Sequence, residues 1–420
     1  MQSTIRRAIA VASIVVCSSL AGCAAGGSAL SAGEESDCSQ PPTTGVDDDT
    51  IKIGATVPLS GALSVYGGAI AAQRAYFDMV NAEGGVTSKD GKTRQIELVV
   101  LDDAYDPSKA KTNTDELVNR EEVFALSHAF GTSQQLAARP VLEEACAPSV
   151  WIASGNPAIS DPEHPYLVGI GVLTVVEGQV MAQYLRENMP DATVAILAQN
   201  GDFGVPFVEG FTETIEGSGV TIVDTQTYEP TDTDVRAQVT TLAASGADAF
   251  FIVGTGNAVL QAMNNAHSLG WTPQILVPQG AAVSLDVLRK LDPGAADGAL
   301  IGNVFKDPER DADDPAMRLF LEEFAKQPNA SGYSEAHALG GWIAGELTVK
   351  VLESLESVDR ESFIDAVHDF RYDAITVVKD GIPLYTSPGE PYIVRGEGLD
   401  VYDAGAGTLS PFQVVDASGR

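Results

Sequence analysis

The chain has 420 residues, of which 44% are hydrophobic, and it carries 58 acidic and 25 basic side chains for a formal net charge of −33. This length is sufficient for two or three domains, each with its own buried core. The acidic balance argues against nucleic acid and against an anionic membrane surface as partners, because both would be repelled.

Residues 1–22 have the organisation of an export signal. Two arginines precede an apolar run of signal-peptide length at residues 8–20. The stretch Leu20-Ala21-Gly22-Cys23 then matches the lipobox of bacterial lipoproteins, which predicts cleavage before Cys23 and diacylation of its thiol. Buried acyl chains contribute about 0.8 kcal/mol per CH₂, so we expect Cys23 to anchor the exported chain in the lipid bilayer, at the outer face of the cell membrane. An ordinary secretory signal with a chance cysteine is the alternative.

Residues 23–50 are rich in Gly, Ser, Ala, Pro and Asp, which predicts a flexible tether. At about 5–6 Å × √n, such a tether spans roughly 30 Å. Cys38 and Cys146 are the cysteines that remain beside the lipidation site once the signal is removed. Two thiols in an oxidising compartment predict a disulfide, with two buried free thiols as the alternative.

From residue 51 onward, short apolar runs alternate with amphipathic stretches. The first succession predicts strands at 51–57, 96–101, 123–127 and 149–152, and helices at 64–82, 107–119 and 133–145. The second predicts strands at 193–198, 220–227, 249–253 and 274–277, and helices at 175–188, 205–216, 234–244, 258–269 and 285–291. Apolar strands separated by helices are typical of parallel sheets that are covered on both faces. Two such successions predict a fold of two doubly wound α/β lobes.

The last third of the sequence is less regular. A polar segment at 306–332 precedes a long helix at 335–355, which we expect to pack on the first lobe, and residues 370–420 are expected to complete the second lobe. The first lobe then comprises residues 51–171 and 306–366, and the second 172–305 and 367–420. The chain would cross between the lobes near 169–174, 300–307 and 365–375. Three crossings predict a hinge, because each restricts the others to one axis of bending.

Small residues with hydroxyl or amide groups follow the predicted strands. Ligands of open parallel sheets bind outside the carboxyl ends of the strands. The loops at these ends are 58–61, 130–133 and 153–156 in the first lobe, and 199–204, 254–257 and 278–280 in the second. Backbone N–H groups at helix starts can hold a carboxylate, so the six loops together predict one cleft for a small solute. Helix capping is the alternative for any single loop.

The sequence lacks the motifs GxSxG, GxxxxGK[ST], CxxC and HExxH, and it has no GxGxxG after a strand. Asp102 and Asp103 are adjacent at a strand end, where neighbouring side chains point in opposite directions, which favours capping over acid–base catalysis. The five histidines are scattered and are interpreted as surface or capping residues; they are His128, His164, His267, His337 and His368. We therefore expect a binding protein and not an enzyme, with no metal and no cofactor.

A set of short motifs resembles the type I periplasmic binding proteins of the leucine/isoleucine/valine-binding class. They are Ile53-Gly54 with Gly61, Tyr66-Gly67, Asn81-Ala82-Glu83-Gly84-Gly85 and Asp102-Asp103. The resemblance runs from about residue 51 to residue 355. It implies two α/β lobes, a three-strand hinge and a site between the lobes for an amino acid or an amide. It also implies delivery of the solute to an ATP-driven permease.

The resemblance carries ligand-binding roles to several positions. Tyr66 corresponds to an aromatic wall beside the ligand. Thr132 and Ser133 fall near a hydroxyl that meets the ligand carboxylate, and Gly131 is closest to it in a gap-free alignment. The next carboxylate-binding turn corresponds to Ala153, Ser154 and Gly155, and an aromatic ring of the second lobe corresponds to Phe203.

The chain departs from this pattern at four positions. Gln279 stands where amino-acid binders place a carboxylate for the ligand ammonium group, and Gly256 stands where they place a tyrosine. A neutral amide attracts an ammonium group less than a carboxylate does, and Asp202 is a candidate replacement. Tyr105 and Phe130 replace a cysteine pair of some relatives, so a Cys38–Cys146 bridge would be a separate link between the tether and the first lobe.

We therefore expect the lipid-anchored solute-binding protein of an ABC importer, acting as a monomer. Its partners would be a small amphipathic solute, the ABC permease and the lipid bilayer through Cys23, with no nucleic acid. The expected solute is a branched-chain amino acid, an amide or a small carboxylic acid, and Phe203 with Gly256 leaves room for a body larger than valine. A receptor module that senses the same solutes without transport and a secreted α/β enzyme are the alternatives.

Overall fold

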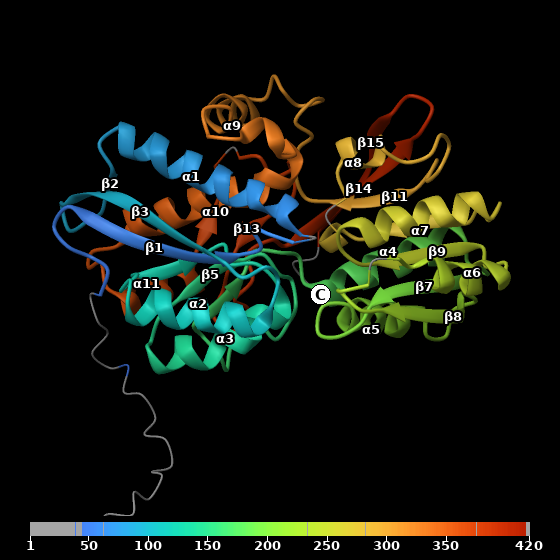
Figure 1. Cartoon of the computed structure of the whole chain (residues 1–420), viewed down its shortest axis with the longest axis horizontal. Coiled ribbons are helices and arrows are strands. Elements are labelled where there is room, and N and C mark those ends of the chain that lie inside the picture. The colour runs from blue at the N-terminus through green and yellow to red at the C-terminus, as the bar shows by residue number, and fades with distance from the viewer. Residues whose placement is uncertain are drawn as a thin grey trace, which may run out of the picture. The chain divides into compact units, whose positions relative to one another are not determined.

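The computed structural model describes Cys38 and residues 44–61, 63–232, 234–281, 283–374 and 376–416. The predicted signal at 1–22, the lipidation site Cys23 and most of the predicted tether lie outside the described residues. Two α/β lobes make up the described chain (Figure 1). No helix among the described residues is long and apolar enough to cross a membrane.

The first lobe is built on a six-stranded sheet with the order β2-β3-β1-β4-β5-β6. Its strands are β1 (Thr50–Val57), β2 (Val86–Thr87), β3 (Thr93–Asp102), β4 (Ala125–Ser127), β5 (Ser149–Ile152) and β6 (Leu167–Gly169). Neighbouring strands are parallel except β2 with β3. The lobe's helices are α1 (Gly67–Ala82), α2 (Pro107–Asn119), α3 (Thr132–Glu144), α9 (Pro315–Phe324), α10 (Glu335–Ser354) and α11 (Arg360–His368). The helices α1 and α10 cover one face of the sheet, and α2 and α3 cover the other (Figure 1).

The second lobe is built on a seven-stranded sheet with the order β15-β14-β11-β10-β9-β7-β8. Its strands are β7 (Thr193–Gln199), β8 (Thr221–Tyr228), β9 (Ala249–Val253), β10 (Gln274–Val277), β11 (Leu300–Asn303), β14 (Gly396–Asp403) and β15 (Thr408–Asp416). The strands β14 and β15 are antiparallel to their neighbours, and the others are parallel. Its helices are α4 (Thr174–Asn188), α5 (Val205–Ile215), α6 (Arg236–Ala244), α7 (Asn257–Ser268) and α8 (Leu285–Leu288).

Central strands bury side chains on both faces of each sheet. In β7, Val194 and Ile196 pack in the cluster that contains α4 and α5, whereas Ala195 and Leu197 pack in the cluster of α6 and α7. All four side chains are fully buried. A strand covered on both faces has no polar side, which explains why the sequence reads here as a continuous apolar run.

The two sheets share one strand order. In each lobe the first parallel strand lies between the second and the third, as β3-β1-β4-β5-β6 and as β8-β7-β9-β10-β11. The strand order therefore reverses beside β1 in one lobe and beside β7 in the other. Ligands of doubly wound sheets bind at such reversal points, outside the carboxyl ends of the strands. This arrangement confirms the predicted fold of two doubly wound α/β lobes.

Three connections between the sheets lie side by side. They link β6 to α4, β11 to α9 and α11 to β14. Gly169, the last residue of β6 where the first connection begins, pairs with Tyr392 in the third, and Phe305 in the second pairs with Val378 in the third. A short antiparallel ribbon of β12 (Arg371–Tyr372) and β13 (Leu384–Tyr385) belongs to the third connection. Three adjacent, paired connections between two lobes are the arrangement expected of a hinge.

Several predicted elements differ from the structure. The polar segment at 306–332 contains the helix α9, and neither α11 nor β11 was expected. The predicted helix at 64–82 begins as a 3₁₀ turn, Ser64–Tyr66, before α1, and the predicted helix at 285–291 ends at Leu288. The turn at Tyr66 places the aromatic ring at the start of α1, which matters for the site.

Residues 44–49, which fall in the predicted tether, pack against the first lobe. The backbone N–H of Lys52 donates to the carbonyl of Gly45 at 2.8 Å, and Val46 pairs with Ile51. Cys38 and Cys146 form a disulfide with their Cα atoms 5.8 Å apart. The disulfide therefore joins the N-terminal segment to the end of α3.

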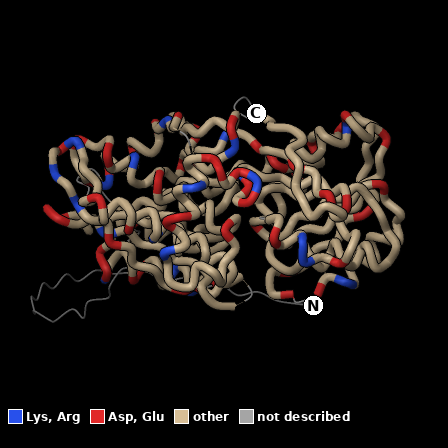
Figure 2. The backbone as a smooth tube through the Cα atoms, turned by 90° about the horizontal axis from the view of Figure 1, so that it is seen from above, with Lys and Arg blue, Asp and Glu red and all other residues tan. Residues whose placement is uncertain are grey.

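Acidic positions occur along both lobes (Figure 2). This distribution agrees with the net charge of −33 and with a solvated acidic surface.

Candidate functional site

A cavity of about 180 Å³ lies between the two lobes, at the carboxyl ends of the strands. Eight of the predicted ligand-binding residues line it: Tyr66, Gly131, Thr132, Ala153, Ser154, Gly155, Phe203 and Gln279. Two others, Ser133 and Gly256, are not among the described residues that line it. Five of the six predicted loops therefore contribute residues to one cavity, whereas no residue of the loop 58–61 is among the described residues that line it.

The start of α3 is the part of this cavity that favours binding of an anion. Its N-cap is Gly131, and no side chain caps the first turn. The backbone N–H groups of that turn are therefore free for a ligand, and the positive end of the helix dipole favours a carboxylate there. Gly131 has φ 94°, and a Cβ at this position would lie 2.2 Å from the Gln134 side chain. Only glycine fits this backbone.

Thr132 and Ser154 place two hydroxyl groups beside this helix start. Their oxygens are 2.8 Å apart, and the backbone N–H of Asn156 donates to the Ser154 hydroxyl at 3.2 Å. Both side chains are buried. One hydroxyl donates to the other, so at least one O–H of the pair can turn toward a ligand oxygen. The backbone of Val172 packs so closely against Gly155 that only glycine fits there, because a Cβ would lie 1.7 Å from the carbonyl oxygen of Val172.

Aromatic rings form a wall of the cavity beside the helix start. Tyr66 stacks on Phe130 with ring centroids 4.7 Å apart, and Tyr105 meets the edge of Phe130 at 5.9 Å. All three rings line the cavity. The aromatic wall that includes Tyr66 therefore has two further rings, those of Tyr105 and Phe130.

Tyrosine hydroxyls also join the lobes. The backbone N–H of Gly256 donates to the Tyr66 hydroxyl, and a hydrogen bond joins the Tyr105 hydroxyl to the Gln199 side chain. Burial raises the pKa of Tyr66 to about 12, so the phenol remains neutral. Gly256 therefore contacts Tyr66 of the aromatic wall through its backbone N–H. It has no side chain that could contact the solute.

Asp202 joins the lobes as well. The Ser133 hydroxyl donates to the Asp202 carboxylate at 3.0 Å, and the Asn156 side chain donates to the Asp202 carbonyl. Ser133, which was predicted to contact the ligand, therefore bonds to Asp202 of the second lobe instead. Asp202, the candidate partner of a ligand ammonium group, bonds to the first lobe and is not among the described residues that line the cavity.

Two buried carboxyl groups lie under the turn that contains Gln279. The backbone N–H of Gly280 donates to Glu177 at 2.7 Å, and that of Gln279 donates to Glu397 at 3.1 Å. Burial raises the pKa of Glu397 to about 8, and burial together with the charge of Glu397 raises the pKa of Glu177. Glu177 lines the cavity. The two carboxyl groups accept hydrogen bonds from the loop after β10. Their burial favours the protonated form of both groups.

Replacing Glu397 by glutamine should change how stability depends on pH. Between the ordinary pKa near 4.5 and the folded value of about 8, the folded state holds a proton that the unfolded state has lost. The free energy of unfolding of the wild type therefore falls as the pH rises through this range, by up to about 1.4 kcal/mol per pH unit. Denaturant unfolding at pH 5 and pH 8 should show a smaller fall for Glu397→Gln, with Glu83→Gln as an exposed control. Parallel pH profiles for wild type and Glu397→Gln would contradict the burial of an acid pair.

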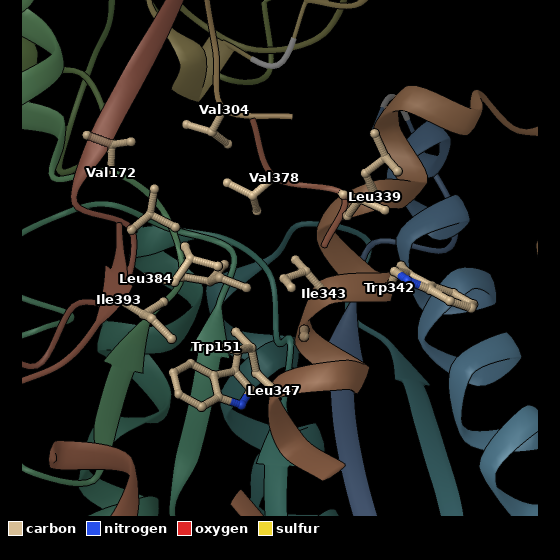
Figure 3. Packing of buried hydrophobic residues seen from close by; sticks show 14 of the residues in the cluster. Trp151, Val172, Val304, Leu339, Trp342, Ile343, Leu347, Val378, Leu384 and Ile393 are labelled. Carbon is tan, nitrogen blue, oxygen red and sulfur yellow. The ribbon is translucent and has the colours of Figure 1, made fainter. Parts of the chain in front are cut away.

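The part of the cavity near the hinge is apolar. Ile343 and Leu347 of α10 face Val304, Val378 and Leu384 of the connections (Figure 3). All five side chains are buried and line the cavity. The cavity therefore combines an anion-binding helix start with a chamber that suits an apolar body.

Sequence reasoning missed several residues of the site. His128 and His337, interpreted as surface or capping histidines, line the cavity, as does Glu177. Tyr105 and Phe130, to which no ligand-binding role was assigned, line it as well. His128 directly follows β4, and the residues after strands were expected to contact the ligand. Its position along the chain therefore indicated a place in the site. Among the described residues, no group of three or more His, Cys, Asp or Glu side chains could hold a metal ion.

Comparisons with known proteins agree with this geometry. The family model described as periplasmic binding protein matches residues 50–382. The leucine-, isoleucine-, valine-, threonine- and alanine-binding protein of Pseudomonas aeruginosa is 23% identical over 334 residues, which cover 78% of this chain and 84% of that protein.

Solved structures show the same fold. A branched-chain amino acid ABC transporter protein from Thermus thermophilus with bound valine has a TM-score of 0.75 at 19% identity, covering 89% of this chain and 98% of that one. A fatty acid ABC transporter substrate-binding protein from Thermomonospora curvata has a TM-score of 0.75 at 24% identity, covering 90% and 94%. The matched family model and the two-lobed site identify the chain as a type I periplasmic binding protein of the leucine/isoleucine/valine-binding class.

Proposed function

We propose that this protein is the extracytoplasmic solute-binding component of an ABC importer, and that it binds a small solute with a carboxylate and an apolar body between its lobes. The observation that carries the proposal is the cavity between the lobes. The uncapped start of α3 with Thr132 and Ser154 lies in one part of it, and the apolar chamber lies in another.

The relatives support this solute class. Their names include a binder of leucine, isoleucine, valine, threonine and alanine and a fatty acid binder. Both kinds of ligand carry a carboxylate next to an apolar body. Gln279 does not supply the negative charge that an ammonium group needs, so the carboxylate and the apolar body are the features on which the proposal depends.

Binding is proposed to close the lobes about the three paired connections. A solute that contacts both lobes stabilises the closed form through its higher affinity for that form. The hydrogen bonds from Ser133 and Asn156 to Asp202 would form on closure, because they join loops of different lobes. The lobe boundaries at 171–172, 305–306 and 366–367 remain our proposal, and the permease is proposed to recognise the closed form.

A thermal-shift screen tests the binding proposal. The candidates are aliphatic amino acids, amides, and aliphatic and aromatic acids, each at a concentration well above the expected Kd. A ligand at 100 times its Kd stabilises the folded state by about 2.7 kcal/mol, which raises Tm by several degrees. A screen in which no carboxylate raises Tm would contradict the proposal. Chemical change of the recovered ligand would instead indicate an enzyme.

Lipid anchoring at Cys23 is a separate part of the proposal. Cys23→Ala removes the thiol that would be acylated, so the protein is expected to appear in the soluble extracytoplasmic fraction and not in the membrane fraction. Fractionation of cells that express each form, followed by detection with an antibody, measures this. Continued membrane association of Cys23→Ala would exclude the anchor without affecting the binding proposal.

A further inference from the structure

His128 has an unusual position in the wall of the cavity. It follows the last residue of β4, its side chain is 3% exposed, and it lines the cavity. Its backbone has φ 60°, and that of its neighbour Trp151 has φ 55°. Bulky residues rarely adopt this left-handed conformation, and such strain is concentrated at functional sites.

The hydrogen bond of the His128 ring fixes its tautomer. Nδ1 lies 3.2 Å from the carbonyl oxygen of Trp151. A carbonyl oxygen only accepts, so Nδ1 carries a proton and donates it. Burial lowers the pKa of His128 to about 4, so the ring is neutral near pH 7. Nε2 is therefore unprotonated and has a free lone pair.

No described residue donates to this lone pair. The reason is visible on α10, where Gly340 faces the ring. A Cβ at Gly340 would lie 3.4 Å from Cε1 and 3.7 Å from Nε2 of His128, and 4.0 Å from the ring of Phe305. Gly340 and Phe305 line the same cavity. The absence of a side chain at Gly340 leaves the Nε2 edge of His128 uncovered.

The surroundings of Nε2 restrict what can donate to it. Leu339 and Ile343, which lie next to Gly340 and one turn after it on α10, line the cavity with apolar side chains, as does Phe305. An ammonium or amide group brings two or three N–H donors, of which one acceptor satisfies one, and the rest would be buried without partners. A hydroxyl group brings a single donor, which Nε2 satisfies completely.

We propose that His128 Nε2 accepts a hydrogen bond from a hydroxyl group of the solute, so that the ligand is a monocarboxylic acid whose apolar body carries a hydroxyl group. This inference rests on the proposed function, because it takes the carboxylate to bind at Thr132 and Ser154. His128 is then the residue that distinguishes hydroxylated acids from their plain counterparts. A site built to bond a hydroxyl group discriminates strongly against an analogue without one.

Two matched pairs of acids test the inference: 4-hydroxybenzoate with benzoate, and 6-hydroxyhexanoate with hexanoate. Isothermal titration of the wild type should give at least tenfold tighter binding of the hydroxylated member in the pair whose body fits the chamber. His128→Asn tolerates positive φ, and its amide can donate to Trp151 in place of Nδ1, but it provides no acceptor at the place of Nε2. We expect the Kd values of this variant for the two members of a pair to differ by no more than about threefold. The wild-type preference of tenfold corresponds to about 1.4 kcal/mol, and the variant would lose most of it.

Two further variants complete the test. His267→Asn changes an exposed histidine of α7 and should keep the wild-type preference. Gly340→Ala should reduce the preference from the side of α10, because its methyl group occupies the space beside Nε2. This variant also carries the test if His128→Asn does not fold.

Distinct outcomes separate the two proposals. Equal binding of both members by the wild type, or an unchanged preference in His128→Asn and Gly340→Ala, would overturn the role of His128 and leave the proposed function intact. Binding of none of the four acids would also overturn this inference. The proposed function would then depend on the thermal-shift screen alone.

Discussion

Replacing Thr132 and Ser154 together by alanine is expected to weaken solute binding by more than tenfold. The two hydroxyls lie 2.8 Å apart beside the uncapped start of α3. Hydrogen bonds to a charged group contribute about 1.5–3 kcal/mol each, and 1.4 kcal/mol corresponds to a tenfold change in Kd. Removing both hydroxyls avoids leaving either one as a buried donor without its partner.

Titration of the best acid from the thermal-shift screen measures this effect. The double variant should keep nearly the unfolding midpoint of the wild type, because the two hydroxyls bond to each other and only the Asn156 backbone N–H loses an acceptor. Thr212→Ala with Thr240→Ala is a matched control, since both threonines are exposed and bond their own helices. An unchanged Kd in Thr132→Ala/Ser154→Ala would remove the carboxylate site from the start of α3.

Gly341→Ala is expected to cause the largest loss of stability. A Cβ at Gly341 would lie 1.7 Å from the carbonyl oxygen of Ala69, where α10 crosses α1. No atom of a side chain can approach a backbone oxygen so closely, so the two helices must separate. Overpacking of a buried contact costs about 1–3 kcal/mol, and a shift of two whole helices places this variant at or above the upper end.

The neighbouring glycine provides the control. Gly340→Ala adds the same methyl group on the same helix, but its nearest contact would be an ordinary 3.4 Å. Alanine is favoured over glycine inside a helix by roughly 0.5–1 kcal/mol, so Gly340→Ala should be neutral or slightly stabilising. Denaturant unfolding gives both values. Similar free energies of unfolding for the two variants would mean that α1 and α10 do not touch at Gly341.

The fold could be predicted largely because its strands are buried on both faces. The strands at 149–152, 249–253 and 274–277 have the bounds expected from apolar runs alone. The helix α9 was missed because its segment is polar, although it carries recognisable signals. Asp314 caps it, Pro315 follows at the first helical position, and Met317, Phe320 and Phe324 form its buried stripe. These three residues recur at the i, i+3 and i+7 spacing of an amphipathic helix, so the stripe, the cap and the proline together were evidence for α9 within an otherwise charged segment.

The site could be predicted where it depends on the ends of strands, and not where it depends on how the lobes meet. Thr132, Ser154 and Gln279 follow directly from strands and reach the cavity. The roles of Ser133 and Gly256 depend on contacts with the opposite lobe, which no local pattern encodes. Glu177 was missed for a different reason, because its place under the loop after β10 results from packing between α4 and that loop within the second lobe.

Small-angle X-ray scattering of the ligand-free protein and of the protein saturated with its best acid measures the closing motion itself. If the solute draws both lobes together about the three paired connections, the radius of gyration falls on saturation. A radius of gyration that stays the same, at a concentration where titration shows full occupancy, would contradict binding by lobe closure.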